Sequence, residues 1–277
     1  MSEGAEDPNL QVESNRALWD KWTAVHVDSD FYHVDTFKAG DNRLRDYEIA
    51  DLGDVTGKDL LHLQCHFGLD TLSWARLGAN VTGIDYSEAA IAEARKLASE
   101  VGLDARFVSS NVYELPSNLD GDFDIVYTSR GVLGWLPDLD RWADVIAHFL
   151  RPGGIFYITE AHPVAHIFDD DEGATELEVK YDYFSKKALE FPVKGSYADP
   201  DADVDHDVSY DWEHGIGEIV TSLVSSGLRI EFLHEHPFLE WPAPFLVPAD
   251  DGSFVLPDKQ VGRIPLMFSL KASKPTS

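Results

Sequence analysis

The chain has 277 residues, and 44% of them are hydrophobic, which is enough for one large α/β domain with an insertion or for two small domains. Asp and Glu number 50 against 22 Lys and Arg, a formal net charge of −28, and such a surface repels the phosphates of DNA and RNA. No apolar run could span a bilayer, the acidic start does not resemble a signal peptide, and the lone Cys65 excludes an intrachain disulfide, so we expect a cytoplasmic protein without a membrane partner.

The first 54 residues predict a helical flap ahead of the main domain, which we place at 55–277. Residues 1–12 are polar and predict a disordered lead. Apolar residues at helical spacing predict helices over 13–25 and 44–52. The aromatic loop between these helices includes Phe31 and Tyr32, which either pin the segment onto the domain or cover a ligand.

Residues 58–87 predict half of a nucleotide-binding unit. A helix after the first strand, with Asp70 as its cap, would point N–H groups at a ligand. Asp85 follows the second strand directly, where a carboxylate can accept hydrogen bonds from ribose hydroxyls. The pattern gives, in order, a strand at 59–63, a turn at 64–68, a helix at 70–77 and a strand at 81–84.

Strands continue to alternate with helices after this unit. Ser87 is a good cap for a helix that ends near Val101, before Gly102. The alternation predicts an α/β fold with a doubly wound, parallel sheet. The expected elements are strands at 106–109, 123–128 and 155–159, a helix at 139–150 and a turn at 151–154.

The pattern changes after the fifth strand. Acidic clusters separate short β-like pieces, such as 176–184, so we interpret 161–213 as an insertion that forms a lid over the substrate. Regular elements then return, and they complete a set of seven strands. These elements are a helix at 214–226, a strand at 228–233, a Pro-rich loop at 245–262 and a strand at 265–272.

Taken in order, these pieces resemble the class I S-adenosylmethionine-dependent methyltransferases, most closely over residues 55–160. The resemblance rests on LLHLQCHFG at the family's cofactor loop, VTGIDYS at its ribose-binding strand, NVYELP at its adenine contact, FDIVYTSRGVLGWL at its substrate loop and LRPGG before its fifth strand. It implies a Rossmann-like, mostly parallel seven-stranded sheet with an antiparallel last strand. It also implies S-adenosylmethionine as cofactor and methyl transfer to a small-molecule acceptor by in-line displacement.

The cofactor loop departs from the usual family pattern of an acidic strand residue followed by several glycines. His62 replaces the acid, Gln64 and His66 replace two glycines, and Gly68 alone remains. An LQCHFG-type loop resembles that of a subgroup of the family. The added side chains predict a loop that wraps less tightly around the methionine part of the cofactor.

The resemblance implies a set of cofactor-binding residues, of which Asp85 is the main candidate. Asp85 has an alternative role as a helix cap, and Asn111 has one as a turn residue. We expect Cys65 to offer backbone groups and not to act as a nucleophile, because no basic neighbour is evident. The set is Gln64, Cys65, His66, Gly68, Asp85, Tyr86, Asn111, Val112 and Ser129.

The candidate catalytic bases are His162, just past the fifth strand, and Tyr127, with a structural role as the alternative for each. His162 and His166 stand four apart ahead of acidic residues 169–171, but the neighbouring proline and the lack of an HExxH glutamate argue against a metal site. The acceptor pocket is expected to be walled by Trp135, Trp212 and Trp241, although core packing is the default for tryptophan.

Two other functions compete with methyl transfer. A protein that binds S-adenosylmethionine without catalysis, such as a sensor or partner subunit, would share most of these motifs. A nicotinamide-dependent oxidoreductase needs a G-x-G-x-x-G turn, which residues 64–68 lack. The acidic charge also has two explanations, a cationic partner or adaptation to high salt. The even spread of acids along the chain favours adaptation to high salt.

Overall fold

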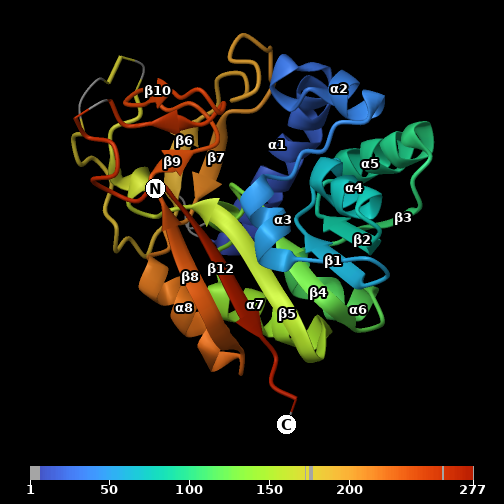
Figure 1. Cartoon of the computed structure of the whole chain (residues 1–277). Helices are drawn as coiled ribbons and strands as arrows, with labels where there is room; N and C mark the ends of the chain where they lie inside the picture. Colours follow the sequence, from blue (N-terminus) through green and yellow to red (C-terminus); the bar gives the residue numbers. More distant parts are fainter. Residues whose placement is uncertain (1–6, 172, 175–176, 258, 277) are drawn as a thin grey trace.

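The computed structural model, which describes residues 7–171, 173–174, 177–257 and 259–276, is built around a seven-stranded sheet (Figure 1). The strand order is β3-β2-β1-β4-β5-β12-β8. β12 is antiparallel to both of its neighbours, and the other pairs are parallel. The prediction of a mostly parallel sheet with an antiparallel last strand is confirmed. The strands are β1 (Asp59–Leu63), β2 (Asn80–Asp85), β3 (Ala105–Ser109), β4 (Phe123–Thr128), β5 (Leu150–Ala161), β8 (Arg229–His236) and β12 (Met267–Ser273).

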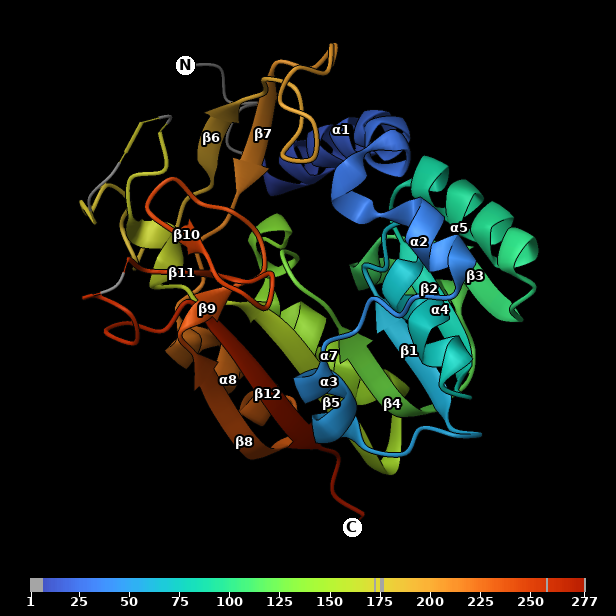
Figure 2. The ribbon, with the colours of Figure 1, turned by 45° about the horizontal axis from the view of Figure 1, so that its top comes forward.

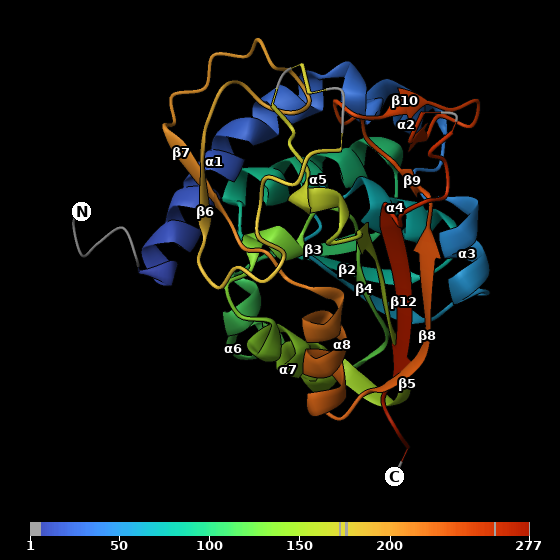
Figure 3. The ribbon, with the colours of Figure 1, turned by 90° about the vertical axis from the view of Figure 1, so that its left-hand side faces the viewer.

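Helices cover both faces of this sheet, and Figure 3 shows α3 on one side of it and α7 and α8 on the other. α3 (Asp46–Leu52), α4 (Leu69–Arg76) and α5 (Glu88–Val101) belong to the first face, where Trp74 packs on Tyr127. α6 (Leu115–Asn118), α7 (Leu139–Phe149) and α8 (Ile216–Ser225) belong to the second, where Trp142 packs on Phe156. Strands with two buried faces need near-continuous apolar runs, as the central strands β1 and β4 have. The doubly wound, Rossmann-like arrangement is therefore confirmed.

The N-terminal segment is more helical than its sequence predicts. α1 (Pro8–Asp28) begins at a proline behind the Asp7 cap, so the expectation of a disordered lead is wrong for residues 8–12, and residues 1–6 lie outside the described part. The 3₁₀ turn η2 (Asp30–Tyr32) and α2 (Val34–Ala39) occupy the predicted loop. α1 lies beside α5 and β7, at the end of the central sheet (Figure 2).

Two small sheets lie above the same end of the central sheet (Figure 2). β6 (Leu189–Pro192) and β7 (Val208–Asp211) form an antiparallel pair within the insertion. β9 (Phe238–Leu239), β10 (Val247–Pro248) and β11 (Phe254–Val255) form a second sheet, and β10 and β11 lie where a Pro-rich loop was expected. The prediction of a strand at 176–184 is wrong for residues 177–184, where Val179 forms only an isolated bridge with Phe168. Residue 176 lies outside the described part of the chain.

The LRPGG segment was predicted as a turn before the fifth strand, and it is instead part of β5. The register of β5 against β4 shifts between Phe123 and Ile125, and Gly153, with φ of 80°, provides the irregular backbone. Short turns η3 (Val112–Glu114), η4 (Leu133–Trp135) and η5 (Ala165–Ile167) connect the elements. Within the described residues, none of the helices has the length and apolar character to cross a bilayer.

Candidate functional site

A cavity of about 1380 Å³ opens at the carboxyl ends of the parallel strands. It is lined from the loops after β1, β2, β3, β4 and β5, and also from α1, the insertion and the segment from Leu239 to Phe254. Ligands collect at this edge in open α/β sheets. Single small-molecule sites occupy roughly 300–1,000 Å³, so this cavity has room for a cofactor and a second molecule together.

The loop after β1 carries left-handed backbone at three positions. Gly68 has φ of 84°, and the non-glycine residues Gln64 and His66 have φ of 56° and 49°. A left-handed L-residue costs roughly 1–2 kcal/mol. Gln64 and His66 therefore adopt, at an energetic cost, the left-handed conformation that glycine adopts freely. A Cβ on Gly68 would lie 2.8 Å from the ring of Phe107, so a side chain there has no space.

Asp85 lies at the end of β2 and lines the cavity. Its carboxylate accepts a hydrogen bond from the backbone N–H of His66 at 2.8 Å and another from that of Ser87 at 2.9 Å. Burial raises the pKa of Asp85 to about 6, and these two N–H groups oppose that rise. Each carboxylate oxygen has two lone pairs, so the group is oriented and can still accept from a diol.

The predicted cofactor residues are brought together on one cavity. Asn111 also accepts from the N–H of Tyr113 at 3.0 Å, so it shapes the turn as well. Burial raises the pKa of Cys65, which keeps its thiol protonated. Two buried atoms, Gln64 Oε1 and His66 Nδ1, have no hydrogen-bond partner within the described residues. The residues that line the cavity include Gln64, Cys65, His66, Gly68, Asp85, Tyr86, Asn111, Val112 and Ser129.

The N-terminal segment closes over this loop through aromatic and histidine contacts. His26 Nδ1 lies 2.9 Å from His66 Nε2, and His26 Nε2 lies 2.6 Å from Ser196 Oγ. The Trp19 ring meets the His66 ring edge to face at 5.1 Å. Trp19, Phe31 and Tyr32 also line the cavity. His26 of α1 therefore joins Ser196 to the loop after β1.

Two arginines at the cavity have roles that the sequence pattern does not reveal. Arg130, just past β4, pairs with Glu48, with Asp70 at 3.0 Å and with Glu240 at 2.7 Å. Asp70 is therefore an ion-pair partner, and its predicted role as helix cap is wrong, since Gly68 holds that position. Arg43 lines the cavity without a carboxylate at ion-pair distance in the described part of the chain.

His162 and Tyr127, the two predicted bases, do not line this cavity. His162 is buried, with Nε2 3.1 Å from Glu235 and Nδ1 accepting from the N–H of Val164 at 3.1 Å. Tyr127 is buried in the sheet and donates its hydroxyl proton to Glu48 at 2.5 Å. A base must come within hydrogen-bond reach of its substrate. Their assignment as catalytic bases does not fit this geometry.

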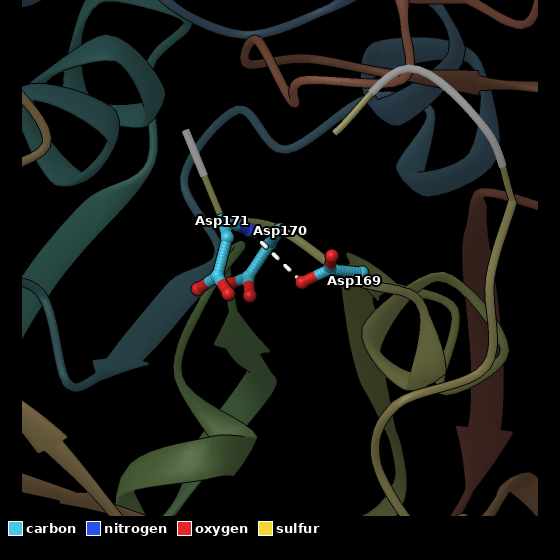
Figure 4. Close-up of side chains that lie close together, drawn as sticks. All are labelled: Asp169, Asp170 and Asp171. Atoms are coloured by element: carbon cyan, nitrogen blue, oxygen red, sulfur yellow. Dashed lines mark hydrogen bonds between the residues drawn. The ribbon is translucent and has the colours of Figure 1, made fainter. Parts of the chain in front are cut away.

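The acidic run at 169–171 places three carboxylates close together, as Figure 4 shows. Asp169 accepts from the N–H of Asp171 at 3.2 Å. Lys180 pairs with Asp169 at 2.8 Å and with Asp171 at 2.7 Å. His162 faces Glu235 instead of this run. Lys180 therefore already supplies the positive charge that these two carboxylates need.

Tryptophans and acidic residues also line the cavity. Trp135, Trp212 and Trp241, the predicted walls of the acceptor pocket, all contribute to it. Glu160, at the end of β5, accepts from the N–H groups of residues 131–133 at 2.6–3.2 Å and so fixes the loop after β4. Asp211 and Glu213 lie beside this loop and also line the cavity.

Comparison with known proteins gives consistent results. Residues 61–158 match the family described as a methyltransferase domain. A ubiquinone biosynthesis O-methyltransferase of Bordetella avium is 30% identical over 172 residues, which are 59% of this chain and 68% of that protein. The enzyme of that name from Alkalilimnicola ehrlichii is 35% identical over 130 residues, 46% of this chain and 52% of that protein. The chain spans about half the length of the first-ranked curated relatives.

Solved structures share the fold. The crystal structure of an S-adenosylmethionine-dependent methyltransferase from Mesorhizobium loti superposes with a TM-score of 0.55 at 23% identity. The match covers 81% of this chain and 94% of that one.

Proposed function

The chain belongs to the class I S-adenosylmethionine-dependent methyltransferases, and on that premise we propose that it transfers a methyl group from S-adenosylmethionine to a small-molecule acceptor held in the cavity. One observation carries the proposal. The oriented carboxylate of Asp85, the left-handed cofactor loop and the strand ends all border a single cavity large enough for both reactants. The relatives' name, O-methyltransferase, favours an oxygen acceptor atom.

The residues at the strand ends fit the cofactor. Asp85 would accept hydrogen bonds from the ribose hydroxyls, and Tyr86, Asn111 and Val112 would surround the adenosine. The unpartnered Gln64 Oε1 and His66 Nδ1 match polar groups of the cofactor, because buried polar atoms require partners. Arg43, a cation without an ion pair in the described residues, would meet the methionine carboxylate.

The chain itself contributes orientation and the exclusion of water. The bound cofactor supplies an already activated methyl group, so no side chain has to activate a leaving group. Residues of α1 and of the insertion line the cavity, and we infer that these segments hold the acceptor in place and keep solvent out. Neither predicted base reaches the cavity, so positioning carries the proposed mechanism.

Titration calorimetry followed by a product assay tests the proposal. We expect S-adenosylmethionine and S-adenosylhomocysteine to bind with a stoichiometry of one and NADH not to bind. S-adenosylhomocysteine should then form when small-molecule acceptors are supplied. Binding of NADH in place of S-adenosylmethionine would refute the proposal. Tight binding without product over a broad acceptor panel would instead favour the non-catalytic role.

A further inference from the structure

Three carboxylates, those of Glu160, Asp211 and Glu213, line the cavity, and they differ in the hydrogen bonds that they accept. Glu160 accepts four backbone hydrogen bonds, from residues 131–133 and from Ala161. Asp211 Oδ1 is buried and has no hydrogen-bond partner in the described chain. The Glu213 side chain is 7% exposed and accepts no hydrogen bond from a described residue. Native proteins rarely leave buried carboxylate oxygens without hydrogen-bond partners, because the desolvation of a charged group is costly.

The local backbone directs both groups toward the cavity. Asp211 ends β7, and Glu213 follows it two residues later in the chain. Asp211 packs so closely over the loop after β4 that a Cβ on Gly134 would overlap its carboxylate. Both residues line the cavity. We call Asp170, Asp211 and Glu213 the acidic end of the cavity.

No cation of the described chain neutralises Asp211 and Glu213. His166 Nδ1 is 4.0 Å from Glu213, which is beyond hydrogen-bond distance, and the pKa of that histidine is lowered from its usual value. Lys180 is engaged with Asp169 and Asp171. The nearest charges are other carboxylates. Glu160 and Glu213 act on Asp211, and Asp170 acts on Glu213.

Aromatic side chains border the acidic end. The hydroxyl of Tyr181 donates to Asp170 at 2.9 Å, and the ring of Phe191 meets the Tyr181 ring at 5.7 Å. Trp212 lies in the chain between the two carboxylates, and all three aromatic residues line the cavity. Carboxylates beside aromatic faces attract organic cations, through Coulomb attraction and through the ring quadrupole. They repel an anionic molecule.

We propose that the methyl acceptor is an amine-bearing molecule with an apolar ring, and that Asp211 and Glu213 bind its protonated nitrogen. The nitrogen is an anchor and need not be the atom that receives the methyl group. This assignment rests on the proposed function, because it specifies the acceptor for the same cavity. Burial raises the pKa of Glu213 to about 7 and that of Asp211 well above its usual range, and a bound ammonium would reverse both shifts.

The test uses the full chain saturated with S-adenosylhomocysteine and titrated with tryptamine, tryptophol and indole-3-propanoate. These probes share one ring and differ in the charge at the end of the side arm. We expect tryptamine to bind at least about tenfold more tightly than tryptophol, and indole-3-propanoate to bind most weakly. A lack of preference for tryptamine would overturn the inference, whichever of the other probes binds.

Isosteric variants test whether Asp211 and Glu213 bind the ammonium group of tryptamine. Glu213→Gln and Asp211→Asn should each weaken tryptamine binding by about 30-fold and leave tryptophol binding unchanged, since loss of one partner of a buried charge pair costs several kcal/mol. Glu190→Gln is the matched control, because Glu190 lies in the adjacent strand β6 with an exposed side chain. Unaltered tryptamine preference in both cavity variants would overturn the assignment of these residues.

The binding of S-adenosylhomocysteine separates the two levels of the proposal. If it binds and tryptamine has no advantage, the amine inference fails and the methyltransferase proposal stands. If S-adenosylhomocysteine does not bind, the methyltransferase proposal fails, and the amine inference fails too because it rests on that proposal. The probe series on the unmodified chain gives this answer even if a cavity variant does not fold.

Discussion

The cofactor loop shows how a few backbone angles shape the cavity. Gln64 and His66 hold left-handed conformations although they carry side chains, and each has a buried polar atom without a hydrogen-bond partner in the described chain. Strain of this kind persists only where surrounding contacts enforce it. Here those contacts are the bond from the His66 N–H to Asp85 and the bond between the His66 and His26 rings. The strained loop is therefore tied directly to Asp85, the proposed ribose-binding residue.

Gly68→Ala should cost more stability than Gly102→Ala. Both glycines have positive φ, so each substitution costs about 1 kcal/mol of backbone strain. A Cβ at Gly68 would also overlap the Phe107 ring, which adds about 1–3 kcal/mol, whereas no atom lies within 4 Å of the corresponding position at Gly102. Urea unfolding measures both. Equal losses would show that Phe107 does not restrict this position.

Asp85→Asn should weaken S-adenosylmethionine binding by about 1.5–3 kcal/mol, the usual value of a hydrogen bond to a charged group. Calorimetry measures the loss, and Asp104→Asn, an exposed acid before β3, is the control. Unchanged affinity in Asp85→Asn would mean that the ribose site lies elsewhere.

The pH dependence of cofactor binding follows from the same carboxylate. Burial raises the pKa of Asp85 to about 6 in the ligand-free protein. The ionised form is the better acceptor for ribose hydroxyls, so binding below pH 6 requires loss of a proton. Affinity should therefore rise with pH up to about 6 and then level off. An affinity that is constant from pH 5 to pH 8 would contradict this assignment.

Residue positions at strand ends were predictable, and side-chain directions were not. Asp85 and Gly68 could be located because the βαβ pattern fixes where strands end. The side-chain direction of His162 could not be predicted: Ala161 and Pro163 line the cavity, whereas His162 faces Glu235. Arg43 and Glu213 could not be predicted, because tertiary folding brings them to the cavity and no local sequence motif marks them.

Arg130 joins three secondary-structure elements and one loop segment beside the cavity. Its guanidinium links α3 through Glu48, α4 through Asp70 and the segment after β9 through Glu240, while its own backbone continues β4. Arg45 also pairs with Glu240 at 3.1 Å. The network holds the helices of one face against the sheet edge where the cofactor site lies.

Arg130→Gln should lower the free energy of unfolding by about 3–5 kcal/mol, because it leaves the fully buried Glu48 without its counter-charge. Adding Glu48→Gln should restore part of the loss. Arg229→Gln, which removes an exposed ion pair with Glu231, should cost less than about 1 kcal/mol. Urea denaturation compares the three variants. If the double variant is no more stable than Arg130→Gln, the buried charge of Glu48 is not the cause.

Elements with their own periodicity were predicted closely, as α5 and α8 illustrate. The capping role of Ser87 was confirmed, with its hydroxyl accepting from the N–H of Ala90 at 3.0 Å. The small sheet of β9, β10 and β11 could not be predicted, because strands of two residues depend on their partners and not on their own sequence. For the same reason, α2, a helix of only six residues, could not be predicted from its own sequence.

Across the entire chain, the net charge of −28 is the dominant electrostatic feature. Self-repulsion of this size destabilises a compact state, and salt reduces it because the Debye length falls from about 10 Å at 0.1 M to about 3 Å at 1 M. We expect the melting temperature to rise by several degrees between dilute buffer and 1 M KCl. Sorbitol at equal osmolality controls for solvent effects unrelated to charge. An unchanged melting temperature in KCl would refute adaptation to high salt.

The cavity described above also has a consequence for folding. Val12 and Phe254 line the same space, so its walls come from nearly opposite ends of the chain. Contacts between such distant residues require the closure of long loops, which makes them late events in folding. A nascent chain can form β1, β2 and the loop between them long before this enclosure exists. The cofactor can therefore bind only after the tertiary structure is complete. Its binding energy stabilises only chains that have folded completely.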